Sequence, residues 1–217
     1  MHILKGRVFL AKGIDVSKWQ GVIDWEKAKK GGVGFAILRL GFTGTASRKP
    51  ALDGQFRRNL AQCKRHGIDA GVYYYSTATT ERQAKAEARF IIKQLKGEKL
   101  QYPVYIDTED VLQANLSKSK LTAVVKAFCD EMEKAGYYVG IYANKNWFAE
   151  QLNDGKLKAY DKWVAQYNDK CTYSGAYGMW QYTDKGKIAG INGFVDLNKC
   201  YKDYPKIIKK AKLNGYK

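Results

Sequence analysis

Pro103-Val104-Tyr105-Ile106-Asp107-Thr108-Glu109 is a short apolar run that ends in two acids, and a segment with helical periodicity lies on each side of it. The two flanking segments, 80–97 and 119–136, each begin near a residue that commonly caps a helix and end at a glycine. An apolar strand between two such helices is typical of β/α units around a parallel sheet.

The same alternation recurs along most of the chain. Further helices are expected at 24–32 and 53–67, with at most a short one at 146–152. An open doubly wound sheet would use the same alternation, but the strand count and the short late connections favour closure. The sequence therefore predicts the α/β class, as an irregular TIM-like (β/α) barrel with eight strands and fewer than eight helices. The expected strands are 13–17, 35–41, 70–76, 103–109, 139–144, 162–167, 178–183 and 194–198.

The length of 217 residues suits one domain with a sizeable core. We expect a single catalytic domain over residues 1–217, with the barrel in about 10–205 and a basic tail at 206–217. Two interpretations of the tail stay open, a terminal helix that covers the barrel and a junction to a further module. The opening residues, 1–13, predict neither a membrane anchor nor a signal peptide.

The charge balance indicates an anionic partner. There are 38 Lys and Arg against 21 Asp and Glu, a formal net charge of +17. Such a field attracts polyanions, and a basic surface that only aids solubility is the alternative explanation. The four cysteines form no CxxC pair, and the two histidines form no cluster, so no metal site or cofactor is expected. Cys63 and Cys129 are expected to be buried free thiols, while a Cys171–Cys200 disulfide is conceivable.

Asp107 and Glu109 are the strongest candidates for chemistry. Side chains alternate along a strand, so these two share one side, with Cα atoms roughly 6.5–7 Å apart. An acid-x-acid triplet is weak evidence by itself, and two others, at 24–26 and 131–133, have structural explanations in helices. Only the triplet at 107–109 follows an apolar strand, where burying charge is unfavourable without a functional reason.

Two further acids are expected at the same place. Asp15 and Asp196 lie on the first and last predicted strands, which become neighbours when a barrel closes. Repulsion and partial burial should raise the pKa of at least one of the four acids. A protonated acid beside ionised carboxylates is what glycosidic bond cleavage requires.

Aromatic residues at several predicted strand ends would suit a saccharide groove, since rings give sugars apolar faces and hydroxyl partners. Each ring could equally belong to the core, and only their joint placement supports a groove. No GxxxxGK[ST], GxGxxG, HExxH or GxSxG motif stands in a suitable context, so nucleotide, zinc-protease and serine-hydrolase sites are not expected. The expected groove residues are Tyr75, Tyr142, Trp163, Tyr167, Trp180 and Arg39.

Five segments together resemble glycoside hydrolase family 25, the Chalaropsis-type lysozymes, in order along nearly the whole chain. They are Lys12-Gly-Ile-Asp-Val-Ser-Lys-Trp-Gln-Gly21, Tyr105-Ile-Asp-Thr-Glu109, Trp163-Val-Ala-Gln-Tyr167, Met179-Trp-Gln-Tyr182 and Val195-Asp-Leu-Asn198.

The resemblance implies an irregular β/α barrel that hydrolyses the β-1,4 bond between N-acetylmuramic acid and N-acetylglucosamine, with retention. Glu109 matches the proton donor of the family, and Asp107 matches the nucleophile or the support for the substrate acetamido group. Asp15 and Asp196 match the remaining acids of the site. The groove positions that the resemblance implies are Tyr75, Tyr142, Trp163 and Trp180.

Two other functions remain open. A chitinase-type barrel expects a further Asp two residues before its acid pair, where this chain has Tyr105. A non-catalytic glycan-binding module would not require four clustered acids. Nucleic acid is not expected as a partner, because the acids would repel phosphate. The expected partners are peptidoglycan and anionic wall polymers, with action at the cell wall, outside the cell or after release from the cytoplasm if the chain is a phage endolysin.

Overall fold

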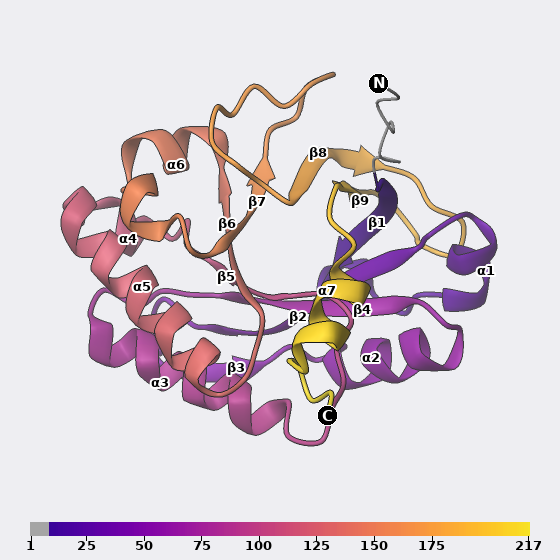
Figure 1. The fold of residues 1–217 in the computed structure, drawn as a ribbon. Helices are drawn as coiled ribbons and strands as arrows, with labels where there is room; N and C mark the ends of the chain where they lie inside the picture. Colours follow the sequence, from indigo (N-terminus) through magenta and orange to yellow (C-terminus); the bar gives the residue numbers. More distant parts are fainter. Residues whose placement is uncertain (1–8) are drawn as a thin grey trace, which may run out of the picture.

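The computed structural model describes residues 9–217 (Figure 1). Eight strands close into a barrel through the pairing of β1 with β2, as predicted, and a ninth strand pairs only with β2. Most of the opening segment, on which the sequence predicts neither an anchor nor a signal peptide, lies outside the described residues. The strands are β1 (Ala11–Val16), β2 (Phe35–Thr43), β3 (Pro50–Leu52), β4 (Asp69–Tyr75), β5 (Val104–Asp107), β6 (Val139–Asn144), β7 (Asp161–Ala165), β8 (Met179–Gly186) and β9 (Val195–Cys200).

The barrel is mixed rather than fully parallel, which corrects the expectation of a parallel sheet. Strand β9 runs antiparallel to both β8 and β1, whereas the other barrel pairs are parallel. The reason is the short connection between β8 and β9. Only residues 187–194 join β8 to β9, and a parallel connection needs a crossover of a dozen or more residues. Strand β3 was not predicted, since three residues are too short to show a pattern.

Seven α-helices accompany the strands in residues 9–217, fewer than eight, as predicted. The four main predicted helices are confirmed, and a glycine with positive φ follows each of them: Gly32, Gly67, Gly97 and Gly136. Helix α5 begins earlier than expected, because the Ser117 side chain rather than Ser119 caps it by accepting from Lys120 N. The helices are α1 (Trp25–Lys30), α2 (Phe56–Arg65), α3 (Glu81–Gln94), α4 (Val111–Ala114), α5 (Lys118–Lys134), α6 (Lys145–Glu150) and α7 (Tyr204–Ala211), with 3-10 turns η1 (Lys18–Gln20) and η2 (Asp154–Leu157).

Two apolar cores stabilise this arrangement. The larger one lies between the strands and the outer helices, and the smaller one fills the barrel itself. At the end where β2, β4 and β5 begin, Phe35 stacks on Tyr102 with ring centroids 4.3 Å apart, and Tyr204 packs edge-on against Tyr102 at 5.5 Å. The start of the predicted basic tail therefore belongs to α7, a terminal helix whose residues Tyr204 and Ile208 are buried against the barrel (Figure 1).

The cysteines are all free. Cys63 and Cys129 are buried, as predicted, but the conceivable Cys171–Cys200 disulfide is not formed. Its two residues lie on different sides of the sheet, since Cys200 belongs to the core inside the barrel and Cys171 packs against the outer core. Within residues 9–217, every helix is too short or too polar to cross a membrane.

Candidate active site

The end of the barrel opposite Tyr204 carries the predicted acids. Asp15 is near the end of β1, Asp107 is the last residue of β5, and Glu109 follows in the turn before α4. Asp196 lies directly opposite Asp15 in the β1–β9 ladder. Because β9 is antiparallel, Asp196 reaches this mouth from the beginning of its strand, not from the end as expected.

Asp15 is buried and well supported by hydrogen bonds. Its Oδ2 accepts from the side-chain amides of Asn198, at 2.7 Å, and Gln181, at 2.9 Å. Burial raises the pKa of Asp15 well above its usual range and the charge of Asp196 raises it further, while the two amides act in the opposite direction.

Asp107 is less well supported by hydrogen bonds than Asp15. It is 8% exposed, and its Oδ1 is buried without a hydrogen-bond partner among the described residues. Burial raises the pKa of Asp107 well above the ordinary range, and the charges of Glu109 and Asp15 add to this, whereas Arg39 opposes it. A carboxyl in these surroundings favours its neutral form more strongly than an ordinary aspartate does.

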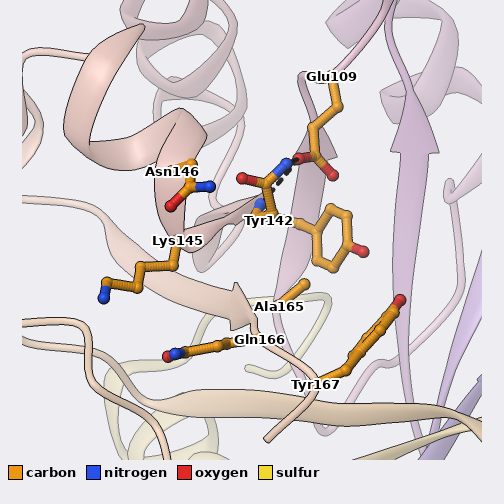
Figure 2. Close-up of a pocket in the computed structure, with 8 residues that line it drawn as sticks. Glu109, Tyr142, Lys145, Asn146, Ala165, Gln166 and Tyr167 are labelled. Atoms are coloured by element: carbon orange, nitrogen blue, oxygen red, sulfur yellow. Dashed lines mark hydrogen bonds between the residues drawn. The ribbon is translucent and has the colours of Figure 1, made fainter.

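Glu109 is held by one neighbour, Asn144. Glu109 Oε1 accepts from the Asn144 backbone N–H at 2.8 Å and from the Asn144 side-chain amide (Figure 2). Asn144 Oδ1 in turn accepts from Trp147 N at 2.9 Å and caps α6, so the amide nitrogen faces Glu109. Burial raises the pKa of Glu109, and the bonds from Asn144 limit the rise. Burial is the largest cause of the raised pKa in all four acids, and repulsion from the other acids of the group adds to it at Asp15 and Asp107.

A cavity of about 510 Å³ opens beside Glu109. Tyr142 and Tyr167, two of the expected groove residues, line it together with Glu109 (Figure 2). A volume of this size is typical of small-molecule and saccharide sites. The remaining lining residues are Asn144, Lys145, Asn146, Ala165 and Gln166.

The other expected groove residues lie elsewhere. Trp163 is 1% exposed inside the barrel, and Trp180 is 3% exposed with its indole N–H bonded to Gln166 O at 2.7 Å. The Tyr75 hydroxyl donates to Asp110 Oδ2 at 3.0 Å. In this structure these three side chains therefore contact protein groups, and the two tryptophans have almost no surface to offer a saccharide.

Arg39 also has a protein partner. Its Nε donates to Asp53 Oδ2 at 2.7 Å, and the Asp53 side chain is fully buried. Asp53 Oδ2 also accepts from Lys18 N at 3.1 Å. The sequence missed Asp53, because a lone acid just before a helix is expected to be a cap.

The amides of Asn144, Gln181 and Asn198 were also missed. Each contacts one of the four acids, but a neutral side chain carries no charge signal, and only its position at the mouth end of a strand could have indicated it. Within residues 9–217, no group of three or more His, Cys, Asp or Glu side chains is arranged to hold a metal ion.

Comparison with known proteins gives consistent matches. The family model for glycosyl hydrolases family 25 matches residues 14–191. The uncharacterized protein YegX of Escherichia coli K12 is 29% identical over 189 residues, which cover 86% of this chain and 68% of that protein. The autolytic lysozyme of Clostridium acetobutylicum is 29% identical over 191 residues, 86% of this chain and 55% of its own length.

A solved structure agrees with the sequence matches. The modular autolysin LytC of Streptococcus pneumoniae, in complex with a synthetic peptidoglycan ligand, superimposes with a TM-score of 0.79 and 28% identity over 88% of this chain. The chain spans about half the length of that protein, 47%, so the match concerns one part of a modular enzyme.

The closed barrel with acids at its mouth defines a glycoside hydrolase of the β/α-barrel type. The family model that matches residues 14–191 gives a more specific assignment. It belongs to glycosyl hydrolases family 25, and the resemblance seen in its sequence segments is confirmed.

Proposed function

We propose that the chain is a lysozyme, an N-acetylmuramidase that hydrolyses the β-1,4 bond between N-acetylmuramic acid and N-acetylglucosamine in peptidoglycan, with retention of configuration. The observation that carries the proposal is Glu109, a carboxyl whose pKa is raised by burial and which lines an open cavity near a second buried carboxyl, Asp107. A raised pKa increases the protonated fraction of a carboxylic acid, and the protonated form is the one that a general acid needs.

Glu109 takes the role of general acid in this proposal. Its proton passes to the glycosidic oxygen as the bond from that oxygen to C1 of the muramic acid breaks, and the positive charge that develops at C1 faces the neighbouring carboxylates. Either Asp107 attacks C1, or it orients the substrate acetamido group, whose oxygen attacks instead. Water then adds to C1 and returns a proton to Glu109, which restores the enzyme.

Two alternative functions have less support. In a chitinase-like barrel a third acid would replace Tyr105, and here Tyr105 is fully buried among the rings of the barrel core. A glycan-binding module without activity would have no need of buried carboxyls with raised pKa values, which are unfavourable for folding.

Glu109→Gln is the first test. The variant keeps the shape of the side chain but has no proton to donate, so release of fragments from purified peptidoglycan should fall by about 10²–10⁴-fold. Glu131→Gln is the matched control, because Glu131 lies on α5 in a surface ion pair with Arg89. The products identify the bond, since new muramic acid reducing ends with the β-anomer formed first agree with a retaining muramidase.

Three results would contradict parts of the proposal. New glucosamine reducing ends would move the cleavage to the other glycosidic bond. An α-anomer formed first would indicate inversion. Binding of peptidoglycan without any release by the unchanged protein would indicate a binding module.

We also propose that anionic wall polymers are partners of the basic surface and that the chain acts at the cell wall. The support is the net charge of +17. Exposed charges are screened by salt, so activity on whole cell walls should fall steeply between about 0.05 and 0.3 M NaCl, while activity on a short soluble glycan should fall much less. An equal loss on both substrates would contradict this role of the charge.

A further inference from the structure

Two side-chain amides meet at one oxygen of Asp15. Asn198 Nδ2 and Gln181 Nε2 both donate to Asp15 Oδ2, at 2.7 and 2.9 Å. All three residues are buried, with exposures of 5% for Asp15, 2% for Gln181 and none for Asn198. Each amide could also turn its oxygen toward Asp15, so something must determine which way it faces.

Trp163 determines the orientation of Asn198. The indole Nε1 of Trp163 donates to Asn198 Oδ1 at 2.8 Å. An indole N–H can only donate, so the oxygen of Asn198 must face Trp163 and its nitrogen must face Asp15. The indole is itself fixed by rings on β6 and β5, with centroids at 4.5 Å for Tyr142 and 5.2 Å for Tyr105.

The orientation of the Gln181 side-chain amide is less strictly determined. Its Oε1 accepts from the hydroxyls of Tyr142, at 2.9 Å, and Tyr167, at 3.1 Å. A phenol can donate or accept, so these contacts would also tolerate a reversed amide. The single contact that permits one arrangement only is the one from Trp163.

We propose that Trp163 is a positioning residue rather than a groove residue, which acts through Asn198 to keep an N–H donor on Asp15 and thereby stabilises the carboxylate form of Asp15 relative to its neutral form. The inference rests on the proposed function only in so far as it concerns catalysis, because the hydrogen-bonded chain from Trp163 to Asp15 exists whatever the substrate is.

The surroundings of Asp15 make this donor important. The nearby acids disfavour a further negative charge, and Arg39, a cation that lowers the pKa of Asp107, is already bonded to Asp53. Without the hydrogen bond from Trp163, the Asn198 oxygen could turn toward Asp15. The N–H donor on the Asp15 carboxylate would then be replaced by a repelling oxygen, which raises the pKa of Asp15. The titratable and charged groups that face Asp15 or its immediate neighbours are Asp196 on β9, Asp107 on β5, Glu109 after β5, Tyr73 on β4, Arg39 on β2, Tyr142 on β6, Tyr167 after β7 and Asp184 on β8. The neutral amides of Asn198 on β9 and Gln181 on β8 complete these surroundings.

Trp163→Phe tests the proposal, since it keeps an aromatic ring and removes only the N–H and part of the ring. Trp25→Phe is a matched control, because Trp25 is equally buried and its indole N–H also donates to an asparagine oxygen, that of Asn59 at 3.1 Å, away from the acids. Both variants should lose stability to a similar extent.

Only Trp163→Phe should change the behaviour of Asp15. A carboxyl ¹³C NMR titration should show the pKa of Asp15 raised by roughly one unit relative to the unchanged protein, with no change in Trp25→Phe. On soluble glycan, kcat should fall about tenfold, the acid limb of its pH profile should move upward, and KM should stay within about twofold. Asn198→Ala removes the same donor and should move the Asp15 titration in the same direction, even if Trp163→Phe does not fold.

Other results would overturn the proposal. A raised KM with unchanged kcat and titration would mean that Trp163 contacts the saccharide. An unchanged Asp15 titration in both variants would remove the positioning role. If the unchanged protein cleaves no peptidoglycan, the proposed function fails, but the NMR titration still decides whether Trp163 acts on Asp15.

Discussion

The two ends of the barrel interior are built from opposite kinds of side chain. At the end closed by α7, aromatic rings contact one another, with Tyr204 against Tyr102 and Tyr138 at centroid distances of 5.5 and 5.6 Å. At the mouth, carboxyls lie close together, and Asp107 keeps a buried oxygen without a partner among the described residues. The closed end favours folding, whereas the mouth opposes it.

This contrast shows how one barrel combines stability with chemistry. Packed rings bury apolar surface and stabilise the fold without affecting charge. Buried carboxyls cost stability, and functional sites are where such a cost is commonly found. Trp163 lies between the two ends of the barrel, since its ring contacts Tyr105 of the core while its N–H donates a hydrogen bond to Asn198 at the mouth.

Tyr204→Ala should produce the largest change in stability. The side chain is fully buried, and removing a buried ring typically costs about 3–5 kcal/mol of unfolding free energy. Chemical denaturation should show this loss, while Tyr204→Phe, which keeps the ring, should lose less than about 1 kcal/mol. Because the ring is at the far end from the acids, the kcat of the folded fraction should stay within about twofold. A tenfold lower kcat at a temperature where the variant is folded would mean that the two ends are not independent.

The acids of the mouth could be predicted from the sequence because a charge directly after a buried strand is conspicuous. Asp107 ends an apolar run and Asp15 lies on the first predicted strand, and the closure of the barrel brings them together as expected. The sense of β9 was not predicted, although the short connection between the expected strands at 178–183 and 194–198 already favoured an antiparallel pair. Asp196 consequently reaches the mouth from the beginning of its strand and not from the end.

The direction of each ring was harder to predict. Barrel strands are buried on both faces, so alternation between apolar and polar residues does not show which side chains point inward. Trp163 and Trp180, which lie on predicted strands, could therefore not be separated from Tyr142, yet of these three residues only Tyr142 lines the cavity. The contacts from Asn144, Gln181 and Asn198 depend on distances between strands, which a single sequence does not contain.

Asp107→Asn should produce a smaller change of opposite sign to Tyr204→Ala. The folded protein raises the pKa of Asp107, so it holds this proton more tightly than the unfolded chain does. Stability from this group is fully present below the unfolded pKa of about 4 and is lost as the pH rises through the folded pKa. The neutral asparagine avoids that loss, so the variant should gain about 0.5–2 kcal/mol at pH 7, as replacements of functional-site charges often do.

Thermal unfolding measured at pH 7 and at acidic pH separates the effect of the Asp107 charge from the effect of its side-chain shape. Near pH 3 Asp107 is protonated in both states, so thermal unfolding of the variant and the unchanged protein should almost coincide. Asp130→Asn is a control of opposite sign, because burial raises the pKa of Asp130 but the hydrogen bonds from Lys126 and Tyr160 outweigh it and leave the pKa lowered. That variant should lose stability at pH 7 and little near pH 3. An Asp107→Asn variant that is less stable than the unchanged protein at pH 7 would show that the Asp107 carboxyl does not destabilise the fold. The two ends of the barrel would then differ in their side chains but not in their effect on folding.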